Sequence, residues 1–523
     1  MYLLLTNDSP SIGTLNHLPP LPLDIDYSDE SRTIGRQDED NIHFGLQQHG
    51  RVRRAVLQAP SSSLRVWLEP MNKLYPRLGD LSLLSTTKEE GNPVLPGTFQ
   101  APDLRRLALH GIDLPTTMPL LSSAIALSTI SLTHIGAPCY FSPGHLVTQL
   151  QGLLHLEELS IGFAIPIPLP SSEGELLPAP IPPVTLPNLR RLTFRGVGVY
   201  LDNLVAQINT PLLERLSLTL FFELAFTLVN LTEFIHRTEK YGCLVAQVAF
   251  NKVGASISAG HFKQPGIEKF SLRVNCDRLD WQIDSAIQVC SALGIVLSTV
   301  EELTLDLDVD GMPSDWENTL DNLLWHELLL SFIGVKKLHI GSSLTLELSQ
   351  ALQSEFVLGL LPELQELEVQ LRIDQAKSAF SGFLAARQSV GHPVSLLALP
   401  TPAPVPSQTS PEMSLVSSSQ SRPVSQSSPE MSLASSSQQV SQYIPEMSLV
   451  SSSQQDSNPR SRMKPEPRPP PQSLKSSSPQ NPRVTARVPN MIYPSRRPLT
   501  STVKQVLTDH QQYVARFWRI DCT

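Results

Sequence analysis

The sequence lacks the features of an exported, membrane-spanning or disulfide-stabilised protein. Its first apolar run, Leu3 to Leu5, stops at Thr6 and is too short for an export signal. No stretch approaches the roughly 20 apolar residues that a membrane span needs. The cysteines are odd in number and show no C-x-x-C spacing, which argues against a disulfide framework and a zinc site; they are Cys139, Cys243, Cys276, Cys290 and Cys522. We therefore expect a soluble protein of the cytoplasm or nucleus, with no membrane partner.

Familiar catalytic motifs are also missing. The sequence contains no G-x-S-x-G turn, no G-x-x-x-x-G-K-[ST] phosphate loop and no H-E-x-x-H metal pair. Gly196-Val-Gly198 lacks the third glycine of a dinucleotide site and is typical of a turn after a strand. His326 and Glu327 follow Trp325 in an apolar stretch, which favours a partly buried helix face over a catalytic pair. We predict no catalytic residue and no cofactor, and an enzyme is the third-ranked alternative.

One acidic run matches the spacing of a calcium-binding loop. Asp306, Asp308, Asp310, Gly311 and Glu317 fit the EF-hand pattern of alternating carboxylates, a glycine turn and a final glutamate. An EF-hand loop must follow a helix, whereas the aliphatic residues here alternate as in a strand. We therefore favour exposed aspartates on a strand and its loop, and we predict no metal site.

Charge and proline content divide the chain near residue 390. Residues 1–390 hold 27 Lys/Arg against 42 Asp/Glu, a balance of -15, and residues 391–523 hold 13 against 7, a balance of +6. Between His392 and Thr500 lie 20 of the 46 prolines and many serines. Such a composition cannot bury enough apolar surface to offset chain entropy. We expect an unstructured segment at 1–20, a folded body at 21–390 and a disordered tail at 391–500.

The tail contains three near-copies of P-E-M-S-L-[VA]-S-S-S-Q, starting at Pro411, Pro429 and Pro445. They indicate either duplication without function or a multivalent docking motif. A basic segment follows, but because prolines and serines dilute it we expect no specific recognition of nucleic acid. The last residues, 501–523, show apolar residues at helical spacing and predict a short amphipathic helix, which docks on the folded body or on a partner.

A six-residue phrase recurs through the folded body: aliphatic, two polar residues, aliphatic, any residue, aliphatic. Examples are LGDLSL at Leu78, LRRLAL at Leu104, LERLSL at Leu213 and VEELTL at Val300. The fourth residue of successive phrases lies at positions 55, 81, 107, 130, 159, 192, 216, 248, 270, 303, 338 and 367. The mean spacing of about 28 residues is within the range of leucine-rich repeats.

Each phrase predicts a short strand whose aliphatic side chains point inward, because successive strand residues face opposite sides. Three stretches between phrases have helical spacing; their apolar faces are Leu146, Leu150, Leu153 and Leu154, then Leu201, Leu204, Val205 and Ile208, then Ile283, Ile287, Cys290 and Leu293. Strand and helix in alternation predict an α/β fold with parallel strands, an irregular leucine-rich-repeat-like solenoid.

Several segments carry a resemblance to a known family. They are LDIDYSDESRT from Leu23, RVRRAVLQAPSSSLR from Arg51, LPGTFQAPDLRRLALHGIDLP from Leu95, LEELSIGFAIPIP from Leu156, LPNLRRLTFRGV from Leu186 and VEELTLDLD from Val300. In these segments the chain resembles the fungal F-box-like proteins with degenerate leucine-rich repeats, over roughly residues 20–390.

The resemblance implies a non-catalytic protein-interaction module, the substrate-binding half of a ubiquitin-ligase receptor. In that family an F-box precedes the repeats and recruits a Skp1-type adaptor. No F-box match occurs here before the repeats, so we expect the adaptor as a partner only if an F-box lies upstream. The alternative is a stand-alone repeat scaffold.

The repeat geometry predicts which polar side chains share the exposed sheet face. The middle column is rich in hydroxyls; it contains Ser82, Ser131, Ser160, Thr193, Ser217, Ser271 and Thr304. The outer columns of the central repeats are basic, with Arg191, Arg195, Arg215, Lys269 and Arg273. The last repeats are acidic, with Glu302, Asp306, Glu366 and Glu368 against Lys337. We predict that the five basic residues bind an acidic or phosphorylated protein segment, the alternative being a merely solvated sheet.

Overall fold

The computed structural model describes residues 3–6, 21–28, 34–87, 91–115, 119–166, 183–221, 226, 228–238, 243–260, 269–276, 279–308, 322–353 and 359–399. The chain divides into two compact units, Met1–Ser414 and Leu415–Thr523. All described residues belong to the first unit. The three repeated decapeptides, the basic tail segment and the predicted C-terminal helix lie outside the described residues.

The strands are β1 (Leu3–Leu5), β2 (Leu23–Tyr27), β3 (Val52–Ala59), β4 (Asp80–Ser85), β5 (Arg106–His110), β6 (Thr129–Ile135), β7 (Glu158–Phe163), β8 (Val184–Thr185), β9 (Arg191–Gly196), β10 (Ile208–Asn209), β11 (Arg215–Phe221), β12 (Val245–Asn251), β13 (Gly254–Gly260), β14 (Phe270–Asn275), β15 (Glu302–Leu307), β16 (Lys337–Ile340), β17 (Glu366–Val369) and β18 (Ser395–Ala398). The α-helices are α2 (Arg36–Gln47), α3 (Ser61–Leu68), α4 (Pro119–Ser123), α5 (Pro143–Leu150), α6 (Gly198–Ala206), α7 (Val229–Arg237), α8 (Leu279–Ala292), α9 (Gly294–Leu297), α10 (Asn322–Leu329), α11 (Thr345–Ala351) and α12 (Ile373–Ser389). Short 3-10 turns are η1 (Glu69–Met71), η2 (Ala137–Cys139) and η4 (Ser342–Leu344).

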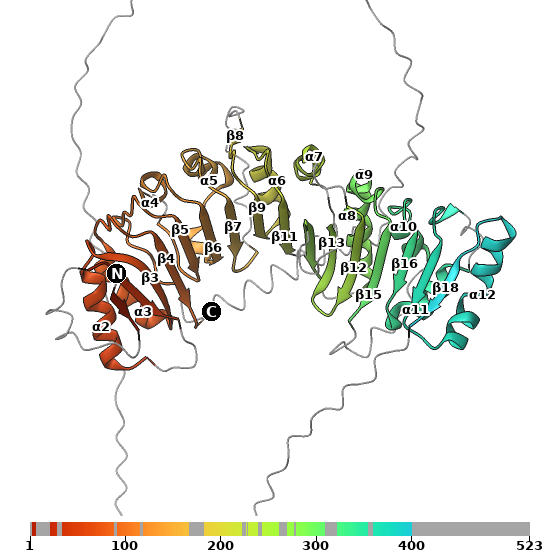
Figure 1. The fold of residues 1–523 in the computed structure, drawn as a ribbon. Helices are drawn as coiled ribbons and strands as arrows, with labels where there is room; N and C mark the ends of the chain where they lie inside the picture. The colour runs from red at the N-terminus through yellow and green to blue at the C-terminus, as the bar shows by residue number, and fades with distance from the viewer. Residues whose placement is uncertain are drawn as a thin grey trace, which may run out of the picture. The chain divides into compact units, whose positions relative to one another are not determined.

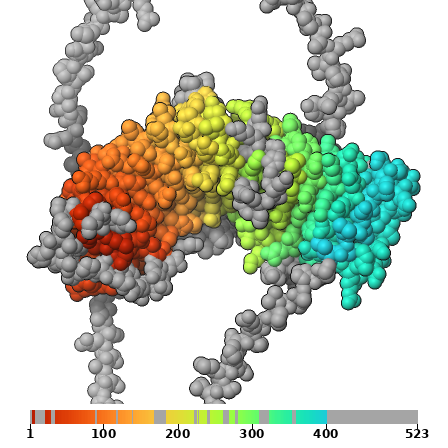
Figure 2. Space-filling model, in the orientation of Figure 1, coloured from red at the N-terminus to blue at the C-terminus, as the bar shows by residue number. Residues whose placement is uncertain are grey.

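The fold is mixed α/β and is built on one large, mostly parallel sheet (Figure 1). Sixteen strands form this sheet in the order β1-β2-β3-β4-β5-β6-β7-β9-β11-β14-β13-β12-β15-β16-β17-β18, and β8 and β10 pair separately. The sheet is open, with β1 and β18 at its edges. Because sequence neighbours are mostly spatial neighbours, the colours follow one another across the space-filling view (Figure 2).

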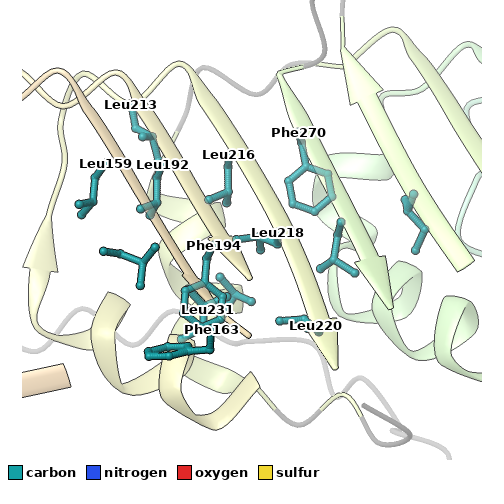
Figure 3. Packing of buried hydrophobic residues seen from close by; sticks show 14 of the residues in the cluster. Leu159, Phe163, Leu192, Phe194, Leu213, Leu216, Leu218, Leu220, Leu231 and Phe270 are labelled. Carbon is teal, nitrogen blue, oxygen red and sulfur yellow. The ribbon is translucent and has the colours of Figure 1, made fainter. Parts of the chain in front are cut away.

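The recurring phrase forms strands because its aliphatic residues line one side of the sheet. The register shifts once between β2 and β3 and once between β6 and β7. One row of residues nevertheless crosses all sixteen strands. In Figure 3, Leu159, Leu192, Leu216 and Phe270 show this row on β7, β9, β11 and β14. These side chains belong to one continuous hydrophobic core that extends from Leu5 to Phe383.

The strand order departs from the sequence order at one place. We expected the phrase VAQVAF at Val245 to form the next parallel strand with Val248 in the buried row. Instead, β12, β13 and β14 form an antiparallel meander, and Ala246 rather than Val248 aligns with Leu303. Val248 is still buried, two residues further along the same strand. The prediction was therefore right about the strand and wrong about its register.

Helices pack against the buried side of the sheet and against each other. Neighbouring pairs include α5 with α6, α6 with α7, α8 with α10, α10 with α11 and α11 with α12. The predicted apolar faces are buried on or beside α5, α6 and α8, with two departures from the prediction. Leu154 is 55% exposed just after α5, and Ile208, although buried, lies on β10 instead of α6. Among the described residues, none of the helices combines the length and apolarity required to cross a membrane.

Both predicted limits of the folded body were too narrow. Residues 1–20 were expected to be unstructured, but Leu3–Leu5 form β1 and pair in parallel with β2. The tail was expected to begin at residue 391, but β18 adds a further strand beside β17. The aliphatic run Leu396 to Leu399 carries that last strand, and composition averaged over the tail concealed it.

Candidate functional site

The polar side of the sheet carries three rows of side chains between the buried ones. We call this side the open face. Its first row runs through Arg54, Asp80, Arg106, Thr129, Glu158, Arg191, Arg215, Lys269, Glu302, Lys337 and Glu366. The middle row contains all seven hydroxyl residues predicted for it. The third row includes His110, Thr133, Gly162, Arg195, Thr219, Arg273 and Asp306.

The five basic residues predicted for the site come together at the centre of this face. We call Arg191, Arg195, Arg215, Lys269 and Arg273 the basic zone. Arg191 and Arg215 are register partners on β9 and β11, and Lys269 comes just before Phe270 on β14. On the third row, Arg195 and Arg273 flank Thr219. Strands are about 4.8 Å apart, so each of these cations has another within two strand spacings.

The basic zone is also where the open face is most accessible. Arg191, Arg195 and Arg273 are exposed, as are the hydroxyl residues Thr193 and Ser217 between them. Most other open-face residues are half-buried. Donors for an anionic ligand are therefore available here, with guanidinium groups on either side of a row of hydroxyls.

The contacts of the five cations differ. Arg191 forms an ion pair with Glu158 of β7, which was not among the predicted site residues. Arg195 lies over the ring of Phe221, with its guanidinium carbon 5.3 Å from the ring centroid. Arg215 and Arg273 form no ion pair with any residue that the structure describes. The sequence did hold the signal for Glu158, because it occupies the same phrase position as Arg191.

The last strands carry an acidic zone of different character, which we define as Glu302, Asp306, Lys337, His339, Glu366 and Glu368. Lys337 Nζ lies 2.8 Å from Glu368 Oε2 and 3.2 Å from Glu366 Oε1. His339 Nδ1 lies 3.5 Å from Glu368 Oε1. Hydrogen bonds to these carboxylates raise the pKa of Lys337, and the bond from Lys337 lowers the pKa of Glu368.

Charged residues on the first strands also form ion pairs. Arg53 Nη2 lies 2.6 Å from Asp24 Oδ2, and Arg54 Nη1 lies 3.0 Å from Asp26 Oδ2. Asp80 Oδ2 lies 3.6 Å from Arg54 Nε, and Arg106 approaches the same oxygen. Opposite charges therefore face each other across strands at both ends of the sheet, while like charges face each other at its centre.

Other candidate positions behave as packing residues. His326 is buried, and its Nε2 lies 2.6 Å from the backbone oxygen of Ala351, which fits the predicted helix face. Gly196 ends β9 and Gly198 begins α6, as expected of a turn. A cavity of about 400 Å³ lies on the helix side; its walls include Ile287, Ser291, Glu327, Leu330 and Ile333.

The possible metal ligands and the cysteine thiols were compared within the described residues. There, no three His, Cys, Asp or Glu side chains lie close enough together to hold a metal ion. Asp306 lies on strand β15 as predicted, and the calcium-loop pattern beyond Asp308 lies outside the description. Burial raises the pKa of the Cys139 and Cys243 thiols to about 11, so both are protonated at neutral pH and are poor nucleophiles.

Comparison of the chain with models of known protein families gave no match, and comparison with functionally characterised proteins gave none either.

Proposed function

We propose that this protein is a non-catalytic interaction module that binds an acidic or phosphorylated protein segment across its basic zone. The supporting observation is the set of five cations on β9, β11 and β14, of which Arg215 and Arg273 have no ion-pair partner in the described part of the chain. Like charges on neighbouring strands are destabilising. A sheet that needed only solvation could use mixed charges, as both ends of this sheet do.

The chemistry of the zone suits an extended anionic segment. Arginine presents a planar fork of donors that pairs with carboxylate and phosphate groups, often through two hydrogen bonds. Thr193, Ser217 and Ser271 form a line of hydroxyls between the two outer rows. A segment crossing these strands would meet cations on both of its flanks and neutral donors beneath it.

We propose further that the sheet and its helices form an irregular leucine-rich-repeat-like solenoid. The in-register buried row supports this, and so does a backbone hydrogen bond repeated from phrase to phrase. At the second phrase position, Arg105 N donates to Gly79 O at 2.9 Å, Ser128 N to Arg105 O at 2.9 Å and Glu157 N to Ser128 O at 2.8 Å. Outside the antiparallel meander of β12, β13 and β14, neighbouring repeats thus contact each other in the same way, as in solenoid proteins.

The resemblance to F-box-like proteins supports a specific cellular role for such a module. In this proposal it is the substrate-binding half of a ubiquitin-ligase receptor, and a Skp1-type adaptor would be held by an F-box upstream of the repeats. Affinity purification of the natural protein separates this role from that of a stand-alone scaffold. Recovery of the adaptor supports the receptor, and its absence under conditions that retain other partners supports the scaffold.

The binding proposal is tested with a fluorescein-labelled oligoglutamate peptide and the full chain, by fluorescence anisotropy at low salt. The double variant Arg215→Ser/Arg273→Ser should weaken binding at least about tenfold, or about 1.4 kcal/mol. The control Arg237→Ser/Lys377→Ser also removes two positive charges, but from helices α7 and α12. Equal binding by the two double variants would show that only net charge attracts the peptide, and the proposed site would be wrong.

A further inference from the structure

The charge on the open face changes sign across two strands, β13 and β12, whose open-face residues are uncharged. In the third row, Arg273 of β14 is followed by two small residues, Ser256 on β13 and Ala249 on β12. The register partner of Ala249 on the next strand, β15, is Asp306. Three strand spacings place the backbones at Arg273 and Asp306 about 14 Å apart. Both side chains are exposed, so a cation and a carboxylate lie in one row on either side of a gap of small residues.

The first row has the same arrangement. Its last cation is Lys269, which comes just before β14 and donates its backbone N–H to Ala259 O of β13 at 3.3 Å. Its first carboxylate beyond the gap is Glu302 of β15, the register partner of Val245 on β12. Both outer rows therefore change from cation to carboxylate between the same two strands, β14 and β15.

Glu302 and Asp306 differ from the other carboxylates of the acidic zone. Lys337 is the register partner of Glu302, but its Nζ contacts Glu366 and Glu368 on the far side. Neither Glu302 nor Asp306 forms an ion pair with any residue that the structure describes. The border of the acidic zone that faces the basic zone thus carries two carboxylates available to a ligand.

The gap itself suits a peptide backbone. Its small side chains let a chain approach the sheet closely, and in the middle row Gln247 of β12 lies between Ser258 and Thr304. The amide of Gln247 forms no hydrogen bond with any residue that the structure describes. A carboxamide can both donate to and accept from a peptide group. A chain that crosses the gap would therefore meet a polar partner for its backbone between the two charged borders.

We propose that the segment bound by the open face is bipolar, with its acidic or phosphorylated part over the basic zone and a lysine or arginine about four residues away, between Glu302 and Asp306. This inference rests on the proposed function and deepens it, because it adds a cation at a fixed spacing to the bound segment. An extended chain advances about 3.3–3.6 Å per residue, so about four residues cover the distance from β14 to β15.

The two borders together would fix the position of the segment. A purely acidic segment that extended beyond β14 would approach Glu302 and Asp306, and like charges repel there. A segment with a cation at that point pairs with both borders, which selects one register along the face. Arg191 and Glu158, one strand spacing apart, neutralise each other within the protein, whereas Arg273 and Asp306 are too far apart to do so without a ligand.

The test compares fluorescein-labelled peptides of identical composition with the full chain, by fluorescence anisotropy at low salt. In the spaced peptide, three serines separate six glutamates from one lysine; in the adjacent peptide, the lysine follows the glutamates directly and the serines come last. Both are also made in reverse order, because the geometry sets the spacing and not the chain direction. In one direction the spaced peptide should bind at least about threefold more tightly than the adjacent one. Since net charge is equal, general attraction does not produce this preference.

The double variant Glu302→Gln/Asp306→Asn removes both carboxylates with little change of shape and should abolish the preference. Its affinity for the adjacent peptide should stay the same or rise slightly. The control Asp40→Asn/Asp374→Asn removes two carboxylates from helices α2 and α12 and should keep the preference. Thermal unfolding checks that both proteins are folded. Asp306→Asn alone, at an exposed residue, should reduce the preference in a protein that folds normally.

Two results would overturn the bipolar segment and leave acidic-segment binding standing. One is equal binding of spaced and adjacent peptides by the wild type in both chain directions. The other is a full preference in the folded Glu302→Gln/Asp306→Asn protein. If none of these peptides bound and the oligoglutamate peptide also failed, the proposed function itself would be wrong.

Discussion

The basic zone and the acidic zone are built on the same repeat but use charge in opposite ways. In the acidic zone, Lys337 bridges two glutamates and His339 approaches one of them. In the basic zone, Arg191 pairs with Glu158, while Arg215 and Arg273 have no ion-pair partner in the described part of the chain. Both zones have an equally buried inner face, with Leu216 and Leu338 at most 1% exposed.

The comparison distinguishes two uses of charged residues. In the acidic zone Lys337, Glu366 and Glu368 form ion pairs within the sheet, and in the basic zone two cations remain available for a ligand. Paired charges across neighbouring strands contribute modestly to stability. Unpaired like charges contribute nothing favourable in the free protein and become favourable only when an anion neutralises them. We therefore expect substitutions of the paired residues in the acidic zone to change stability, and substitutions in the basic zone to change binding.

The largest expected effect tests whether the inner faces are equivalent. Leu216→Ala in the basic zone and Leu338→Ala in the acidic zone should each lower the free energy of unfolding by about 2–5 kcal/mol, because each leaves a cavity in the same core row. Chemical denaturation measures both. The outer-face control Ser217→Ala should change stability by less than about 0.5 kcal/mol. A large difference between the two leucine variants would mean that the zones differ in the packing of their buried residues and not only in their charges.

The next effect tests the pairing in the acidic zone. Lys337→Met removes the cation between Glu366 and Glu368, and the side chain of Glu368 is only 13% exposed. Without Lys337, Glu368 keeps only the longer contact with His339, and loss of the closer hydrogen bond to a largely buried carboxylate costs about 1–3 kcal/mol. Arg215→Met is the matched substitution in the basic zone, and it should be neutral or slightly stabilising because it removes a like-charge contact. A similar loss of unfolding free energy in both variants would mean that the charges of the two zones contribute to stability in the same way.

The Lys337 variant should also respond differently to acid. The pKa of Glu368 in the folded protein lies below its ordinary value of about 4.3. Its ion-pair stabilisation is therefore present above that ordinary value and is lost as pH falls through the lowered folded pKa. The difference between wild type and Lys337→Met should shrink as pH falls below about 4. Thermal unfolding across this range measures it, and a constant difference would rule out the ion pair as its cause.

Most of the sheet could be predicted from the sequence because its signal is local. Eleven of the twelve phrases have their fourth residue in the buried row that crosses the sheet. The five basic site residues followed from that spacing, because side chains alternate strictly along a strand. Glu158 was not predicted as a site residue, because its repeat precedes the run of basic residues that begins at Arg191.

The antiparallel hairpin does not follow from the spacing of the phrases. Strand β13 reads GASISAG, and its small residues do not match an aliphatic phrase. Its turn did leave a signal, since Asn251 Oδ1 accepts hydrogen bonds from Val253 N and Gly254 N. Gly254 is required there, because a Cβ atom would lie 2.0 Å from the backbone oxygen of Val274. The order of β12, β13 and β14 depends on such long-range packing, which periodicity does not report.

The smallest expected effect tests the repulsion inside the basic zone. Thr219 lies between Arg195 and Arg273 in the third row, so Thr219→Glu places a carboxylate between two cations. Each new cross-strand pair should contribute about 0.2–1 kcal/mol. Because glutamate has a lower strand propensity than threonine, the proper reference is Thr219→Gln, which has the same length and no charge. Chemical denaturation should show Thr219→Glu to be the more stable of the two, and the advantage should fall as salt screens the charges.

The same variant should lose affinity for oligoglutamate, because the new carboxylate occupies the place of the ligand. A Thr219→Glu protein that was less stable than Thr219→Gln would mean that the cations of the basic zone do not repel one another.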